Sequence, residues 1–214
     1  LAGDSDYLWG LFLVNLGLVY SEAYERENQS FYEQYRDGTL DIEAFCNFSF
    51  APLAAHPLAQ LRTWRAQFVR DCIEPVIAPL APALLEKHRV QGDELLIMTA
   101  TNRFITEPIA ELLGVDTLIA TDPEFVDGRY TGRLTGTPNF REGKVRRLEQ
   151  WLCERDATAS HICFYSDSHN DLPLLLRADE AVVVDPDDRL RAEASLRGWP
   201  VISLRGEPLG LQSG

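Results

Sequence analysis

Lysine is almost absent from this sequence. Lys87 and Lys144 are the only lysines among 20 basic residues, so the other 18 are arginines. Acidic residues number 33, which gives a formal net charge of −13 at pH 7. Nucleic acids and anionic membrane surfaces both attract proteins through clustered cations. We therefore expect neither as a partner.

Long apolar runs are also lacking. The longest, over residues 7–20, is interrupted by two glycines and an asparagine and is too short to span a bilayer. Asp4 and Asp6 precede it, where a secretory signal peptide carries basic residues. The sequence predicts neither a membrane span nor a signal peptide.

Cysteine is scarce and irregularly spaced. The four cysteines show no paired spacing and no companion histidines, so we expect free, mostly buried thiols: Cys46, Cys72, Cys153 and Cys163. Such thiols are typical of a reducing compartment, and we expect a cytoplasmic protein. With 214 residues, 45% of them hydrophobic, the chain can bury a sizeable core.

The first eighty residues have apolar positions at helical spacing. The pattern predicts four helices, over residues 7–16, 21–36, 42 to beyond 50, and 58–73. Asp4 and Asp41 precede two of them as N-caps. Three prolines between residues 75 and 82 mark a junction. We interpret this part as a small helical bundle.

Short apolar runs then alternate with helical segments. Strands are expected over residues 94–98, 118–120, 161–165, 181–184 and 201–204. Helices are expected over residues 103–113, 141–155, 172–177 and 187–197, with a hairpin over 125–134 and a frayed tail over 206–214. This alternation predicts a doubly wound α/β parallel sheet, whose ligands bind at the carboxyl ends of the strands.

Polar residues gather at two of these strand ends. Residues 99–102 follow the first strand, residues 166–171 follow the third, and residues 141–144 open a helix between them. Taken singly, most of these side chains suit helix capping, and Lys144 suits a solvated surface. His169 is expected to be an exposed loop residue without a role.

Together the same residues suit phosphate chemistry. Asp167 and Asp171 can converge on one hard cation, and Mg²⁺ prefers oxygen ligands. A hydroxyl and backbone N–H groups at a neighbouring strand end can hold phosphoryl oxygens. The ammonium of Lys144 can neutralise charge as phosphate transfers.

The order of these residues resembles motifs II, III and IV of the haloacid dehalogenase superfamily. The motifs are Thr99 after Leu-Leu-Ile-Met, then Lys144, then Asp167-Ser-His-Asn-Asp171. The spacing is similar to that of the phosphoserine phosphatase-like subfamily. The stretches TATNRFITEPIA, GTPNFREGKV and FYSDSHNDLPLL resemble its bacterial histidinol-phosphatase-like group.

The resemblance implies a Rossmann-like α/β core with an inserted helical cap. The cap would be residues 7–77, and the core would be residues 78–214 with residues 1–6. It implies a Mg²⁺-dependent phosphomonoester hydrolase that acts through an aspartyl-phosphate on a small phosphorylated metabolite.

The resemblance also implies a role for each motif residue. Thr99 and the backbone N–H of Ala100 would bind the phosphoryl group, and Asn170 would reach a phosphate oxygen. Lys144 would stabilise the aspartyl-phosphate and its transition state.

The resemblance assigns the two acidic residues of motif IV to the metal. Asp167 would be a direct Mg²⁺ ligand. Asp171 would support the metal site from behind the direct ligands, or would orient Lys144.

Two features depart from the family pattern. Ser166 stands where motif IV has glycine, which should shift the turn but keep the ligand. The Asp-x-Asp motif that supplies the nucleophile is not in the sequence, and Leu1 falls a few positions after its place. Since that strand would lie at the centre of the sheet, we expect the sequence to be a piece of a longer chain.

Asp4 stands where phosphoserine phosphatases have a carboxylate for the ammonium group of the substrate. The resemblance thus suggests an amine-bearing substrate such as histidinol phosphate or phosphoserine, although Asp4 also suits helix capping. Two alternatives stay open: a non-catalytic protein that binds a phosphometabolite or a partner, and a phosphatase for another class such as sugar phosphates.

Overall fold

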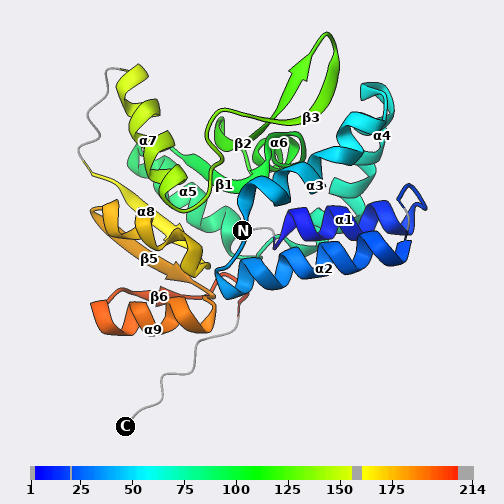
Figure 1. Ribbon diagram of the computed structural model, residues 1–214. Helices are drawn as coiled ribbons and strands as arrows, with labels where there is room; N and C mark the ends of the chain where they lie inside the picture. Colours follow the sequence, from blue (N-terminus) through cyan, green and yellow to red (C-terminus); the bar gives the residue numbers. More distant parts are fainter. Residues whose placement is uncertain (1–2, 20, 156–160, 207–214) are drawn as a thin grey trace. The chain divides into compact units, whose positions relative to one another are not determined.

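The computed structural model describes residues 3–19, 21–155 and 161–206 (Figure 1). These residues form two compact units. The first unit contains the residues up to Ile77 together with Leu95–Phe140, and the second contains Ala78–Glu94 together with the residues from Arg141 onward. Most of the expected tail, residues 207–214, lies outside the described residues.

The predicted helices of the first unit are confirmed. They are α1 (Ser5–Asn15), α2 (Ser21–Asp37), α3 (Ile42–Ala55) and α4 (Leu58–Phe68). The Asp4 carboxylate accepts a hydrogen bond from Tyr7 N at 3.1 Å, and Asp41 accepts from Glu43 N and Ala44 N. Each aspartate therefore satisfies backbone donors that the first turn leaves unpaired.

The fourth helix ends earlier as an α-helix than the periodicity predicts. After Phe68 the chain continues as a π-helical turn (Val69–Ile73) and a 3₁₀ turn (Glu74–Val76). Pro75 lacks a backbone N–H and its ring obstructs the preceding turn, so regular α-helix cannot continue through it.

Aromatic side chains fill the core of the first unit. Trp9 packs against Phe12, Phe68 and Phe104, with ring centroids 5.5, 5.1 and 6.1 Å away. Helices α1 and α2 approach closely, because a Cβ at Gly10 would lie 2.6 Å from the Asn28 side chain. A larger residue at position 10 would therefore displace the Asn28 side chain.

A three-stranded sheet belongs to the same unit. Strand β1 (Leu96–Asn102) pairs in parallel with β2 (Thr117–Val126), and helix α6 (Arg103–Leu112) connects the two strands along the chain. Strand β3 (Arg129–Thr135) then pairs antiparallel with β2. Positive φ angles at Asp127 and Gly128 close the predicted hairpin.

Two strand boundaries differ from the prediction. The short strand expected over 118–120 and the first arm of the hairpin are one continuous strand, β2. Strand β1 runs on to Asn102, so the segment expected to follow the strand is its last part. The pairing of β1 with β2 shifts register between Met98 and Asn102, which takes the intervening residues out of the regular ladder.

The second unit holds a fully parallel sheet in the order β4-β5-β6. Its strands are β4 (Cys163–Ser166), β5 (Glu180–Val184) and β6 (Val201–Ile202). Its helices are α5 (Ala81–Gln91), α7 (Glu142–Glu154), the 3₁₀ turn His169–Asp171, α8 (Leu172–Arg177) and α9 (Asp188–Arg197). Leu175, Val183, Leu190 and Ala194 form a buried cluster between sheet and helices.

Helix α5 is the one described helix that the periodicity did not predict. The helix begins at Ala81, one residue before Pro82. Pro82 therefore lies in the first helical turn, where proline is tolerated, instead of marking a connection between helices. The connections β1-α6-β2 and β4-α8-β5-α9-β6 confirm the α/β class with parallel strands. The cap boundary at residue 77 stays a prediction, since the compact units follow a different division.

No helix among the described residues is both long and apolar enough to cross a membrane.

Candidate functional site

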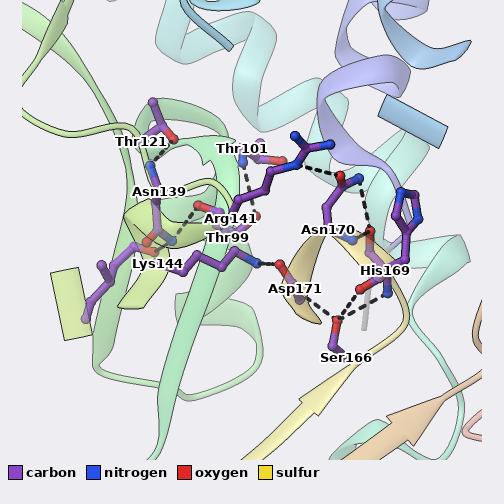
Figure 2. Close-up of polar contacts among 12 residues, drawn as sticks. Thr99, Thr101, Thr121, Asn139, Arg141, Lys144, Ser166, His169, Asn170 and Asp171 are labelled. Atoms are coloured by element: carbon purple, nitrogen blue, oxygen red, sulfur yellow. Dashed lines mark hydrogen bonds and ion pairs between the residues drawn. The ribbon is translucent and has the colours of Figure 1, made fainter. Parts of the chain in front are cut away.

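A buried ion pair stands at the carboxyl end of β4. Lys144 Nζ lies 2.5 Å from Asp171 Oδ1, and the two side chains are 5% and 10% exposed. Lys144 comes from the first turn of α7, and Asp171 ends the 3₁₀ turn after β4. The second oxygen, Asp171 Oδ2, accepts a hydrogen bond from Ser166 Oγ at 2.8 Å (Figure 2).

The residues between Ser166 and Asp171 form a tight polar turn. Asn170 is 2% exposed, and its backbone N–H donates to Ser168 Oγ at 3.3 Å. Arg141 Nε donates to Asn170 Oδ1 at 3.2 Å. Two cationic side chains of one helical turn, Arg141 and Lys144, therefore bind the neighbouring residues 170 and 171.

His169 has a structural partner within this turn. Its backbone N–H and its ring Nδ1 both approach Asp187 Oδ2, at 2.8 and 2.9 Å. Asp187 also caps helix α9 by accepting from Leu190 N. The histidine thus links the turn to α9 and is only partly exposed, contrary to the expectation of an exposed loop residue.

Asp167 directly follows β4, and the residue as a whole is exposed. The surrounding protein desolvates this group and raises its pKa above 3.8, and the Asp171 carboxylate raises it further. No group of three or more histidine, cysteine or acidic side chains converges among the described residues.

The donor set nevertheless fits Mg²⁺. This ion is usually held by one or two carboxylates, substrate phosphates and several waters rather than by an all-protein cage. Asp167, an exposed residue, offers its carboxylate for direct binding. Both oxygens of Asp171 are engaged by Lys144 and Ser166, so Asp171 suits the alternative role of orienting the lysine.

The polar end of β1 belongs to the first unit. Thr99 Oγ1 accepts from Thr101 N at 3.2 Å, inside the segment where the pairing with β2 shifts. Thr99 and Ala100 are half-buried, whereas Thr101 and Asn102 are buried. The side chain of Asn102 caps α6 by accepting a hydrogen bond from Ile105 N. Helix capping, which the sequence suggested for the residues after this strand, is therefore the role of Asn102.

Asn139 holds this strand end and was not singled out by sequence. Its Nδ2 donates to Thr99 O at 2.9 Å and to Ile119 O at 2.8 Å, and its backbone N–H donates to Thr121 Oγ1 (Figure 2). The residue is fully buried. One amide group therefore fixes the ends of β1 and β2 together where regular pairing fails.

Asp6 is a second residue that sequence reasoning missed. Asn102 Nδ2 donates to Asp6 Oδ1 at 3.1 Å, and Ser5 Oγ donates to Thr101 Oγ1 at 3.4 Å. Desolvation by burial, with a smaller contribution from the Asp4 carboxylate, raises the pKa of Asp6 from 3.8 to about 8. Residue type alone carries no signal of such burial.

The predicted site residues thus fall into two sets. Lys144, Asp167, Asn170 and Asp171 lie together in the second unit. Thr99, Ala100 and Asp4 lie in the first unit, where Asp4 is the N-cap of α1 as its capping interpretation predicts.

A parallel-stranded α/β fold with a buried lysine–aspartate pair at a strand end suits the binding and transfer of a phosphoryl group. The model of the haloacid dehalogenase-like hydrolase family matches residues 1–176. The chain belongs to this family, and the resemblance drawn from its motifs is confirmed.

Curated relatives carry names of phosphatases. A histidinol-phosphatase from Neisseria meningitidis (serogroup C, strain 8013) is 43% identical over 94% of this chain and 93% of its own length. Other named relatives match over less of their length, and the chain spans about half of a probable phosphatase from Mycobacterium tuberculosis. The family match and the names of these relatives confirm the prediction that the protein is an enzyme of a phosphatase family.

Solved structures support the fold. A crystal structure from Bordetella pertussis Tohama I is similar with a TM-score of 0.88 and 43% identity, covering 94% of this chain and 92% of that one. A substrate-bound phosphoserine phosphatase complex has a TM-score of 0.68 at 16% identity, over 96% and 88%. At that identity the second likeness concerns the fold alone.

We expect Asp6→Asn to flatten the pH dependence of the free energy of unfolding between about pH 5 and about pH 8. With a pKa of 3.8 when unfolded and about 8 when folded, Asp6 binds a proton more tightly in the folded state. Its contribution to stability is fully present below pH 3.8 and disappears as the pH rises through about 8. Urea denaturation across this range measures the change.

The matched control is Asp41→Asn, which changes an exposed N-cap aspartate of the same unit. It should leave the slope of stability against pH unchanged. If wild type and Asp6→Asn lose stability in parallel on going to about pH 8, Asp6 does not hold a proton in the folded protein.

Proposed function

We propose that this protein is a Mg²⁺-dependent phosphomonoester hydrolase that acts through an aspartyl-phosphate. Its substrate is a small, amine-bearing phosphometabolite such as histidinol phosphate or phosphoserine. The observation that carries the proposal is the buried Lys144–Asp171 pair at the end of β4, beside Asp167 and Asn170. Membership of a hydrolase family with relatives named phosphatases supports it.

Lys144 supplies the positive charge in this mechanism. A compact ammonium held in a nearly dry environment stabilises the charge that develops as phosphate transfers, and little reorganisation is needed because Asp171 fixes its position. Ser166 in turn fixes Asp171. Asn170 lies beside the phosphoryl oxygens in the same turn.

Thr99 and the backbone N–H of Ala100 bind the phosphoryl group from the end of β1. The irregular pairing with β2 in this segment leaves backbone N–H groups outside the regular ladder, where they can donate to phosphate oxygens. Asn139 holds the Thr99 carbonyl, so the Thr99 hydroxyl and the following N–H keep a fixed direction.

The metal is bound by the Asp167 carboxylate. When bound, Mg²⁺ neutralises phosphoryl oxygens and makes phosphorus more open to attack. Asp167 suits this role because it is an exposed residue that directly follows β4.

In the family pattern the nucleophile is the first aspartate of an Asp-x-Asp motif. Its carboxylate attacks phosphorus, and the bond from phosphorus to the alcohol oxygen breaks as the second aspartate of the motif donates a proton to that oxygen. The same aspartate then takes a proton from the water that hydrolyses the aspartyl-phosphate to inorganic phosphate. The support for this step is the family pattern, in which an Asp-x-Asp motif comes immediately before the segment that begins here.

The amine of the substrate is bound by Asp4. Its carboxylate is half-buried at the start of α1, and it caps the helix at the same time. The relative from Neisseria meningitidis is named as a histidinol-phosphatase. Histidinol phosphate carries an amine on the carbon next to the one that bears the phosphate ester. We also propose a cytoplasmic location, which the free cysteines of the described residues support.

A non-catalytic protein that binds a phosphometabolite is the alternative. The intact mass of the protein purified from its native source separates the two proposals. A mass near 24.1 kDa favours the binding protein, because the particular Asp-x-Asp motif that supplies the nucleophile of the family is then missing. A mass larger by at least one strand favours the hydrolase.

In the full-length protein, we expect Asp167→Asn to abolish Mg²⁺-dependent hydrolysis while the fold survives. The substitution removes the charged ligand at an accessible position and changes little of the packing. Release of inorganic phosphate during a Mg²⁺ titration measures the effect, and circular dichroism verifies the fold. Asp188→Asn, an exposed acidic residue of α9, is the matched control, and undiminished activity of Asp167→Asn would refute the metal site.

We expect Asp4→Ala to raise KM for histidinol phosphate and phosphoserine while sparing p-nitrophenyl phosphate, which has no amine. Loss of the N-cap also destabilises α1 by about 1 kcal/mol. Asp41→Ala removes the equivalent cap of α3 and controls for that cost. Steady-state kinetics with the three substrates decide, and an equal loss on all of them would contradict a role for Asp4 in binding the amine.

A further inference from the structure

Asp187 contacts the polar turn after β4 at two points. It stands between β5 and α9, and its backbone N–H donates to Asp167 O at 3.0 Å. Its carboxylate oxygen Oδ2 accepts from His169 N at 2.8 Å and lies 2.9 Å from His169 Nδ1. Asp187 therefore holds the chain at the carbonyl of Asp167 and again, two residues further on, at the N–H of His169.

Helix capping accounts for only one oxygen of the Asp187 side chain. Oδ1 accepts from Leu190 N at 2.8 Å, which is the N-cap bond of α9. Serine and asparagine cap helices about as well as aspartate does, and each has a single side-chain oxygen. A carboxylate has a second acceptor oxygen, and in Asp187 that oxygen binds His169. The turn after β4, rather than the helix, therefore explains why this residue is an aspartate.

The segment before Asp187 fixes its position relative to the sheet. Asp185 follows β5 with a positive φ of 44°. Its N–H donates to Ile202 O at 3.0 Å, and its carboxylate accepts from Leu204 N at 3.1 Å. Pro186 comes next, where it is buried and its ring restricts φ. The loop that carries Asp187 is thus attached to the sheet immediately before it reaches the turn.

The ring of His169 contacts Asp187 at a cost. Its Nε2 is buried and has no hydrogen-bond partner among the described residues. An unpaired buried polar atom destabilises a protein by about 1–3 kcal/mol, so its presence in a folded protein needs an explanation. The contact of Nδ1 with Asp187 offsets part of this cost and adds a side-chain link to the backbone link between the turn and α9.

We propose that Asp187 is a positioning residue for Mg²⁺ binding, because it fixes the backbone that directs the Asp167 carboxylate. The inference rests on the proposed function, in which Asp167 is the metal ligand, and deepens it. On the other side of Asp167, Ser166 is fixed by its pairing with Val183 in the sheet. A ligand that is already oriented loses less freedom when the metal binds. Replacing a residue that orients a metal ligand typically weakens metal binding by about 10–100-fold.

The test measures Mg²⁺ binding by variants of the full-length protein in the absence of substrate. Asp187→Ser keeps an N-cap for α9 but has no second oxygen for His169, whereas Asp187→Ala removes both bonds of the side chain. His169→Ala removes the ring and keeps the backbone N–H. Asp188→Ser is the matched control, since it removes the same charge from the next residue, which is exposed. Isothermal titration calorimetry gives the Kd for Mg²⁺, and thermal unfolding without Mg²⁺ gives Tm.

We expect Asp187→Ser and Asp187→Ala to weaken Mg²⁺ binding equally, by about tenfold or more, which corresponds to about 1.4 kcal/mol. Asp187→Ala should also lower Tm below that of Asp187→Ser, because α9 loses its cap. His169→Ala should weaken Mg²⁺ binding less than either, and Asp188→Ser should bind Mg²⁺ as wild type does. Equal affinity at unequal stability is a result that a merely structural aspartate does not produce.

Three results would overturn the inference. The first is wild-type Mg²⁺ affinity in Asp187→Ser. The second is a loss of affinity that follows the loss of Tm, small in Asp187→Ser and large in Asp187→Ala, which indicates a structural role. The third is an equal loss of affinity in Asp188→Ser, which indicates that charge alone is responsible. If Asp187→Ala does not fold, the comparison of Asp187→Ser with Asp188→Ser still decides.

The same measurements separate this inference from the proposed function. A wild-type protein that binds Mg²⁺ but hydrolyses no phosphomonoester refutes the hydrolase, and the Kd values of the variants still decide the role of Asp187. Wild-type Mg²⁺ affinity in the Asp187 variants of an active enzyme refutes the positioning role alone. A wild-type protein that binds no Mg²⁺ refutes both the metal dependence and the positioning role.

Discussion

The ion pair between Lys144 and Asp171 is the interaction on which the polar end of β4 depends. Removing two charges from water is unfavourable, and their attraction offsets this only with good geometry and further hydrogen bonds. Asp171 meets the condition, because one oxygen contacts Lys144 and the other accepts from Ser166. Loss of either partner would leave a buried charge alone, at a cost of about 3–5 kcal/mol. The pair joins α7 to the turn after β4, so the positions of Asp167 and Asn170 follow from it.

Much of the secondary structure could be predicted because its signals are local. Asp4 and Asp41 cap helices as their sequence context indicates, and α8 has the predicted bounds. Helix α5 and the π-helical turn after Phe68 could not be predicted, because a proline favours a break or a first turn depending on its surroundings. The extension of β1 to Asn102 depends on pairing with β2, which lies far along the chain.

The candidate site divides in the same way. Lys144 and Asp171 were identified from residue type and order, and the structure brings them into contact. Asp6 and Asn139 escaped notice because their importance lies in burial and in hydrogen-bond partners. The likeness to a phosphoserine phosphatase at 16% identity concerns the fold alone, whereas the choice of substrate depends on individual side chains.

The scarcity of lysine acquires a practical meaning once one of the two is buried. Lys87 is exposed on α5, whereas Lys144 is 5% exposed and paired with a carboxylate. Of the two lysine side chains, a reagent that acylates amines in water can reach Lys87 and attach a label or a surface at one known point. Acylation of Lys144 requires the ion pair to open. The rate at which Lys144 is modified therefore reports the rate and extent of local unfolding at the end of β4.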